Sequence, residues 1–177
     1  MPMPSPARSR LCRLLLLAVL VLGQPALAQQ TACVELKGSL LKDRSFNLSD
    51  LAALPQTEIT EARRLSGEQK QEAVTITYRG VLMRDLLNAA GFEDKARHDF
   101  RKSIVIARAS DDYVALFTWG ELFNAKAGEQ VLVIAAINGK PLPESEGPCA
   151  LRALGDIRPG PRHVKWLKQI EVVKATP

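Results

Sequence analysis

The sequence of 177 residues is poor in the residues that most often build metal and redox sites. It contains two histidines, His98 and His163, and three cysteines. Neither histidine has a second one at metal-ligand spacing, and there is no HExxH motif or paired CxxC, so a zinc site built by protein ligands is not expected. The nucleophile elbow and the phosphate-binding glycine loop are also missing. The sequence therefore carries none of the familiar catalytic signatures.

Basic charge is also scarce once the first residues are set aside. The whole chain has a net charge of +5, but Arg8, Arg10 and Arg13 lie in the N-terminal segment. Without these three, the 24 Lys and Arg residues fall to 21 against 19 Asp and Glu, a net charge of +2. No long Lys/Arg run and no interleaving of aromatic and basic residues remains, so a nucleic-acid partner is not expected.

One long hydrophobic run is present, and it follows the three arginines. It extends from Leu14 to Leu22, and residues 26–28, Ala-Leu-Ala, place small side chains where a signal peptidase reads them. The run has about half of the ~20 residues that a membrane-spanning helix needs. We therefore predict a signal peptide over residues 1–28. The product, residues 29–177, is expected to be one soluble periplasmic or secreted domain without a stable membrane anchor.

Two cysteines, Cys33 and Cys149, lie in the expected mature chain. In an oxidising compartment, two distant cysteines in a small domain most often form a disulfide. Such a bond would close almost the whole domain and stabilise it by roughly 4–5 kcal/mol on the chain-entropy model. We predict a Cys33–Cys149 disulfide.

The first half of the mature chain predicts three strands, over residues 34–41, 57–62 and 73–78. A short helix with Asn47 or Ser49 as its N-cap separates the first two strands. Arg79-Gly80 is predicted to turn the chain into a helix over residues 81–90, which has one apolar face and ends at Gly91. The polar stretch 63–72 is predicted to be an exposed loop.

The second half predicts five strands, over residues 104–107, 114–117, 130–137, 149–154 and 168–173. Asp111-Asp112 and Asn138-Gly139 are turn dipeptides. Thr118 is predicted to cap a short helix that runs through Phe123. Many strands with three short helices between them indicate an α+β fold with a mixed, mostly antiparallel sheet.

The segment from Gly155 to Leu167 has an unusual composition. Its glycines and prolines favour a loop that exposes backbone N–H groups, and Arg158, Arg162, His163 and Lys165 place four potential cations within eight positions. Such a loop suits an anion such as phosphate. A solvated basic turn before the last strand explains the same residues, and composition alone favours that second interpretation.

Residues 162–167, Arg-His-Val-Lys-Trp-Leu, with Ile170-Glu171-Val172 after them, resemble the closing motif of the sulfite-oxidase-type molybdopterin-binding domain. Earlier pieces follow in the family's order: residues 78–87 with Ala90-Gly91, residues 111–117, and residues 131–142 with Gly147-Pro148. The resemblance covers nearly all of residues 34–173. It implies the sulfite-oxidase-like molybdopterin-binding fold.

The resemblance also implies roles for the closing loop. Arg162, His163 and Lys165 match the residues that hold the pterin cofactor and its phosphate, and Arg158 of the same loop is a fourth candidate. The family places a molybdenum-binding cysteine upstream of the strand-to-helix segment, whereas Thr57–Gly67 contains no cysteine here. A thiolate is a strong, soft ligand that fixes the geometry of the metal. Because this cysteine is absent, the resemblance supports the fold more securely than it supports the activity.

Three functions are compatible with these observations. The first is a non-catalytic or accessory exported domain that binds a small anionic ligand or a periplasmic protein partner through the former cofactor face. The second is a molybdopterin-dependent oxidoreductase in which Cys149 or a non-protein group binds the metal. The third is a protein-interaction module stapled by the Cys33–Cys149 disulfide. No catalytic residue and no metal ligand are assigned.

Overall fold

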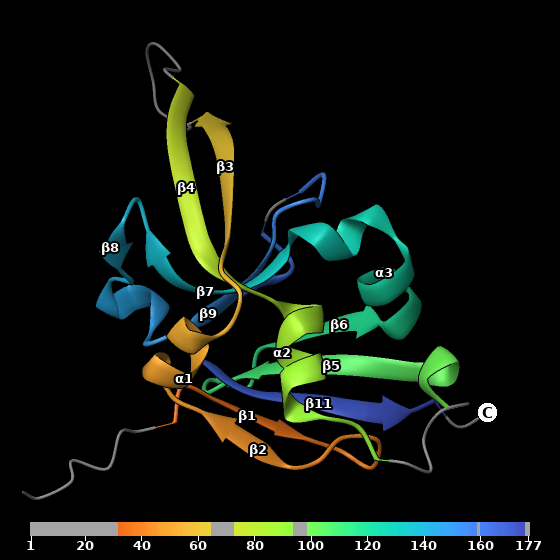
Figure 1. Ribbon diagram of the computed structural model, residues 1–177. Coiled ribbons are helices and arrows are strands. Elements are labelled where there is room, and N and C mark those ends of the chain that lie inside the picture. The colour runs from red at the N-terminus through yellow and green to blue at the C-terminus, as the bar shows by residue number, and fades with distance from the viewer. Residues whose placement is uncertain (1–31, 65–72, 94–98, 159, 176–177) are drawn as a thin grey trace, which may run out of the picture.

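The computed structural model describes residues 32–64, 73–93, 99–158 and 160–175, which form two β-sheets and three short α-helices (Figure 1). The predicted signal peptide lies outside the described residues, as do residues 65–72 of the predicted exposed loop. In the part of the chain that is described, no helix has the length and apolar character to cross a bilayer.

A five-stranded sheet brings the two ends of the domain together. Its strands lie in the order β2 (Arg44–Phe46), β1 (Val34–Lys37), β11 (Leu167–Lys174), β5 (Ser103–Ala109) and β6 (Val114–Thr118). β1 runs parallel to β11, and the other neighbours are antiparallel. Along β5 and β6 buried and more exposed side chains alternate, because only one face of this sheet packs on the core.

The second sheet is antiparallel throughout. Its strands are β10 (His163–Val164), β9 (Ala150–Ala153), β7 (Val131–Ile137), β4 (Ala73–Leu82) and β3 (Thr57–Arg64), with β8 (Lys140–Pro141) also paired to β7. β3 and β4 form a long hairpin that projects from the rest of the domain (Figure 1).

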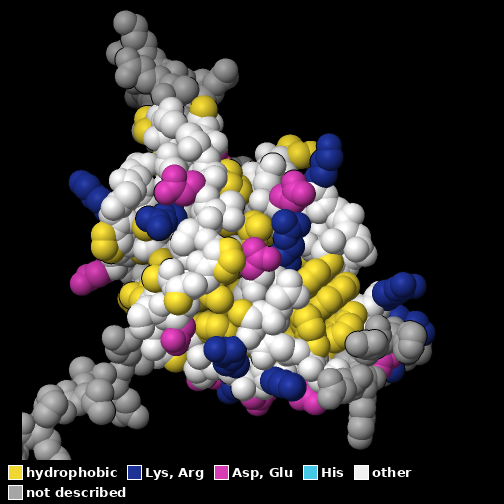
Figure 2. Space-filling model, in the orientation of Figure 1, with side chains coloured by type: hydrophobic (Ala, Val, Ile, Leu, Met, Phe, Trp, Pro, Cys, Tyr) yellow, Lys and Arg dark blue, Asp and Glu magenta, His cyan; other side chains and the backbone are white. Residues whose placement is uncertain are grey.

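The helices are α1 (Leu48–Ala53), α2 (Met83–Ala90) and α3 (Trp119–Asn124), with 3₁₀ turns η2 (Phe100–Lys102), η3 (Lys126–Gln130) and η4 (Glu144–Glu146). Asn47 caps α1 and Thr118 caps α3, and both caps are capping boxes. α2 ends at Gly91, whose φ of +85° favours glycine. Beside α3, where Figure 2 shows hydrophobic side chains gathered, four aromatic rings pack together: Phe92, Phe100, Trp119 and Phe123.

The main core lies between the two sheets, and the disulfide is part of it. Fully buried side chains come from both sheets and from α2, among them Leu36, Leu87, Phe117, Val133, Leu151 and Ile170. The predicted bond between Cys33 and Cys149 is confirmed, with a Cα–Cα distance of 6.0 Å. Because Cys33 precedes β1 and Cys149 precedes β9, the bond links one sheet covalently to the other.

The predicted fold class is confirmed, as are both helix caps and the turn at Asn138-Gly139, where both residues have positive φ. The predicted turn at Arg79-Gly80 is wrong, because β4 continues through it to Leu82 with a β-bulge between the two residues. A glycine is required there, since a Cβ atom on Gly80 would lie 2.1 Å from the carbonyl oxygen of Val133.

Other boundaries also differ from the prediction: β3 continues to Arg64, so positions 63–64 of the predicted exposed loop belong to a strand. The first strand ends at Lys37, and Leu41 forms an isolated bridge with Phe92. The two-residue strand β10 is not foreseen, because His163–Val164 is too short to show a strand pattern.

Candidate functional site

The closing loop, residues 155–167, crosses from the end of β9 in one sheet to the start of β11 in the other. It contains β10, which pairs with β9 and keeps the loop against the second sheet. The Tyr113 hydroxyl donates a hydrogen bond to the Pro161 carbonyl oxygen at 2.7 Å, which ties the loop to the turn before β6. The loop is therefore fixed both to the second sheet, through β10, and to the turn before β6, through Tyr113.

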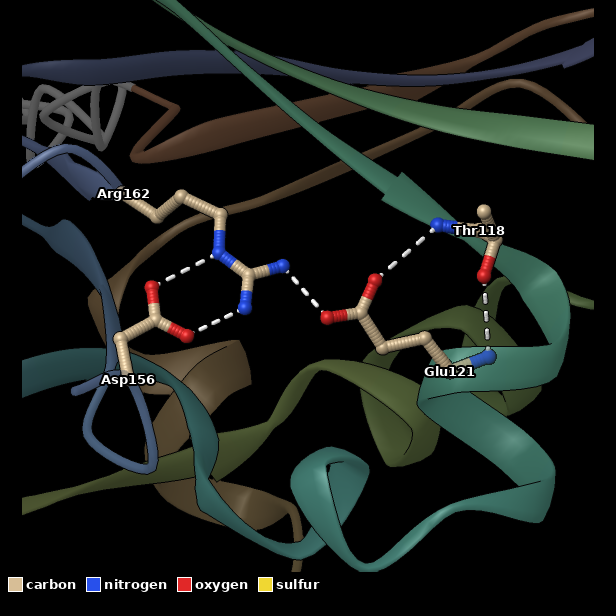
Figure 3. Close-up of polar contacts among 4 residues, drawn as sticks. All are labelled: Thr118, Glu121, Asp156 and Arg162. Atoms are coloured by element: carbon tan, nitrogen blue, oxygen red, sulfur yellow. Dashed lines mark hydrogen bonds and ion pairs between the residues drawn. The ribbon is translucent and has the colours of Figure 1, made fainter.

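At the base of this loop, Arg162 is bonded to two carboxylates (Figure 3). Its Nε donates to Asp156 Oδ2 at 2.8 Å, and its Nη2 donates to the other Asp156 oxygen. Its Nη1 donates to Glu121 Oε1 at 2.5 Å. The guanidinium carbon lies 4.6 Å from the centre of the Phe117 ring, an arrangement that adds a cation–π contact.

Glu121 is placed there by the start of α3. The Glu121 backbone N–H donates to Thr118 Oγ1 at 3.1 Å, and Glu121 Oε2 accepts from the Thr118 N–H at 3.3 Å (Figure 3). The carboxylate thus closes the capping box with one oxygen and binds Arg162 with the other. The capping box at the start of α3 and the closing loop are therefore parts of one hydrogen-bonded network.

The charge around Arg162 is not positive. The hydrogen bond that Arg162 donates to Asp156, and after it the hydrogen bond to Glu121 and the charge of Glu121, raise the pKa of Arg162 above its ordinary value. One guanidinium against two carboxylates leaves this group with a net charge of −1. An incoming phosphate would have to displace at least one of these carboxylates from Arg162.

His163 and Lys165 share a third carboxylate, that of Glu146. His163 Nε2 lies 2.5 Å from Glu146 Oε2, and Lys165 Nζ lies 3.3 Å from Glu146 Oε1. On the other side of the ring, Arg152 Nη1 lies 3.4 Å from His163 Nδ1. Because a guanidinium only donates hydrogen bonds, this geometry makes Nδ1 the acceptor and Nε2 the donor.

Arg152 extends this network into the interior. The residue is buried, and its Nη2 lies 3.7 Å from Glu61 Oε1 of β3. Its guanidinium carbon lies 4.7 Å from the centre of the Tyr78 ring. The chain of contacts therefore runs from β3 through β9 and the closing loop to η4.

The fourth predicted residue, Arg158, is not part of either group. It is exposed at the tip of the loop beside Ile157, which is completely exposed. The structure brings Arg162, His163 and Lys165 together with acidic partners and leaves Arg158 apart. The sequence reasoning did not identify the acids Glu121, Glu146 and Asp156. Only Asp156 lies in the loop itself, whereas Glu121 and Glu146 stand 41 and 17 residues before their partners.

The arrangement of sheets and closing loop has counterparts among known proteins. The family model described as oxidoreductase molybdopterin binding domain matches residues 22–177. The chain belongs to this family. A solved structure with the same fold is the sulfane dehydrogenase SoxCD from Paracoccus pantotrophus, with a TM-score of 0.62 and 21% sequence identity. The alignment covers 84% of this chain and 40% of that chain. No curated protein sequence matches.

Within this oxidoreductase molybdopterin-binding family, the described residues of this chain offer no free thiolate as a ligand for molybdenum. The two cysteines of the described part are bonded to each other and have exposed fractions of 3% and 0%, so neither offers a thiolate. Arg162, His163 and Lys165 each already contact a carboxylate. Within the described ranges, no cluster of three or more His, Cys, Asp or Glu side chains is placed to hold a metal ion.

Proposed function

We propose that this member of the oxidoreductase molybdopterin-binding family is a non-catalytic accessory domain that works outside the cytoplasm and binds a protein partner. The observation that carries the proposal is the pairing of the closing-loop cations with Glu121, Glu146 and Asp156. A loop whose charges are bonded internally supports a structural role better than the capture of a small anion. We place the protein contact at the tip of the loop, where Ile157 is fully exposed beside Arg158.

Two features support the export of the domain. The Cys33–Cys149 disulfide is the kind of bond that persists in oxidising compartments. The arginines, apolar run and small residues before position 29 have the order of a secretory signal. Basic and acidic side chains are interspersed on the face seen in Figure 2.

The second candidate is a molybdopterin-dependent oxidoreductase, and family membership favours it. In this candidate, Arg162, His163 and Lys165 would hold the pterin cofactor and its phosphate, as the family resemblance implies. It requires the cations to leave their carboxylates and a metal ligand other than the disulfide-bonded Cys149. The two candidates therefore differ in cofactor content.

Cofactor content is measured on exported protein from a host that makes the molybdenum cofactor. Elemental analysis for molybdenum and fluorescence of the oxidised pterin are read on one sample. We expect both to be absent. Molybdenum and pterin near one per chain would overturn the proposal, and loss of pterin in Arg162→Ala and Lys165→Ala but not in Arg158→Ala would then assign the cofactor to the loop.

Partner binding is measured by site-specific photo-crosslinking in the periplasm. A photoreactive residue at position 157 is expected to give one discrete protein adduct. The same residue at Leu48, which is 47% exposed on α1, is the control for a generally exposed apolar site. Equal adducts from both positions, or none from position 157, would contradict a partner at the loop tip.

A further inference from the structure

The edges of the two sheets are not protected equally. Exposed edges of natural sheets are usually short, charged or interrupted by proline, because a bare edge pairs with other strands. β2 is three residues long and contains Arg44, β10 has two residues, and β3 contains four charged residues. β6, Val-Ala-Leu-Phe-Thr, is five residues long and has no charge, proline or bulge.

The outer side of β6 is also apolar and accessible. Val114 is 39% exposed and Leu116 is 55% exposed. Both side chains stand on the face of the sheet away from the core, next to Arg108 and Ile106 of β5. A strand with this exposure and no charged residue lacks the usual means of preventing edge pairing.

The backbone of β6 presents free groups at this edge. The Ala109 N–H donates to the Tyr113 carbonyl oxygen at 2.9 Å. Hydrogen-bonded pairs recur at every second residue of an antiparallel ladder, so the next ones along β5 and β6 are Ala107 with Ala115 and Val105 with Phe117. The N–H and C=O groups of Val114 and Leu116 therefore point away from β5. Within the described ranges, no backbone group forms a hydrogen bond with them. Thr118 is the next residue of β6 whose backbone groups point away from β5, and its N–H already donates a hydrogen bond to Glu121.

We propose that β6 pairs antiparallel with β6 of a second copy of this chain, with the two-fold axis at Ala115. In this register Val114 lies opposite Leu116 of the second copy, and the free N–H and C=O groups of both residues find partners. A two-fold axis at Leu116 would require the Thr118 N–H, and an axis at Val114 would place Leu116 opposite Asp112, which lies in the turn before β6 with a φ of +68°. The two five-stranded sheets then form one continuous sheet.

Side chains across this pairing are compatible. On the outer face, each row runs from Arg108 through Val114 to Leu116 and Ile106 of the second copy. The row places no like charges opposite each other, and it buries the two most exposed apolar side chains of β6 against each other. This self-complementarity favours a second copy over an unrelated strand. The interface is small, so we expect a dissociation constant of about 10–100 µM.

The dimer is tested by sedimentation equilibrium of the mature exported protein over a concentration series that brackets this range. We expect a monomer–dimer equilibrium for the wild type and for Leu48→Lys, and a monomer for Leu116→Lys, which places a charge on the edge. Far-ultraviolet circular dichroism of each variant checks that the fold is retained. A monomeric wild type at the top of the series, or a dimer that survives Leu116→Lys, overturns the proposal.

The register is tested separately by cross-linking. Opposed residues of a hydrogen-bonded antiparallel pair have Cα atoms about 5.5 Å apart, which is within disulfide range. The double variant Val114→Cys/Leu116→Cys is therefore expected to form a covalent dimer on oxidation, whereas each single variant forms much less. A stronger dimer from Leu116→Cys alone would place Leu116 on the two-fold axis and overturn the register proposed here.

Discussion

The base and the tip of the closing loop contain the same kind of cation in opposite surroundings. At the base, Arg162 is 24% exposed and bonded to two carboxylates. At the tip, Arg158 is exposed beside a fully exposed Ile157. The comparison shows that the number of basic residues in a loop does not predict an anion site. The position of the neighbouring carboxylates decides which cation remains available.

The largest expected effect is the loss of Arg162. Arg162→Ala leaves Asp156 and Glu121 without their partner, and we expect it to lower the free energy of unfolding by about 2 kcal/mol, or roughly 4–8 °C in Tm. Arg158→Ala is the matched control and is expected to change stability by less than about 0.5 kcal/mol. Thermal unfolding followed by circular dichroism measures both. Equal losses in the two variants would remove the distinction between base and tip.

A smaller effect is expected at the second carboxylate of the base. Glu146→Gln keeps the shape of the side chain but removes the charge that His163 and Lys165 share, and we expect a loss of about 1 kcal/mol. Glu144→Gln changes an exposed acid two residues earlier and should leave the unfolding midpoint unchanged. If the two variants unfold alike, the contacts of Glu146 do not hold the loop.

The smallest effect is expected at a surface ion pair, which serves as a reference for the base. The hydrogen bond and charge of Lys37 lower the pKa of Glu35 below its ordinary value of 4.5. A lowered pKa adds stability that is present above the ordinary value and is lost as the pH falls through the lowered one. The urea midpoint of the wild type should therefore exceed that of Glu35→Gln slightly at about pH 7 and not at about pH 3. A reversed order at the two pH values would contradict the pairing.

Local features of the fold follow well from the sequence. The capping boxes at Asn47 and Thr118 and the helix end at Gly91 depend on residues within one turn of the helix, so their patterns are visible in the chain. The disulfide is also predictable, because only two cysteines remain once the N-terminal segment is set aside. The turn expected at Arg79-Gly80 fails because a glycine required by close packing against Val133 looks like a turn residue.

The site is less predictable than the fold. The basic residues of the loop are easily found, but what they do depends on Glu121 and Glu146, which the tertiary structure brings to them. Nothing in the spacing of these acids links them to the loop. The exposed edge of β6 is likewise invisible until the strand order is known, because an uncharged five-residue strand is equally typical of the centre of a sheet.

The disulfide has a consequence for how this protein responds to proteolysis. Cys33 and Cys149 are separated by 116 positions, so most of the domain, including the projecting β3–β4 hairpin, lies inside one covalent ring. A single cut within that ring opens it but releases no fragment. A molecule nicked once at the hairpin therefore keeps all of its residues in one covalent unit, and its two pieces separate only after the disulfide is reduced.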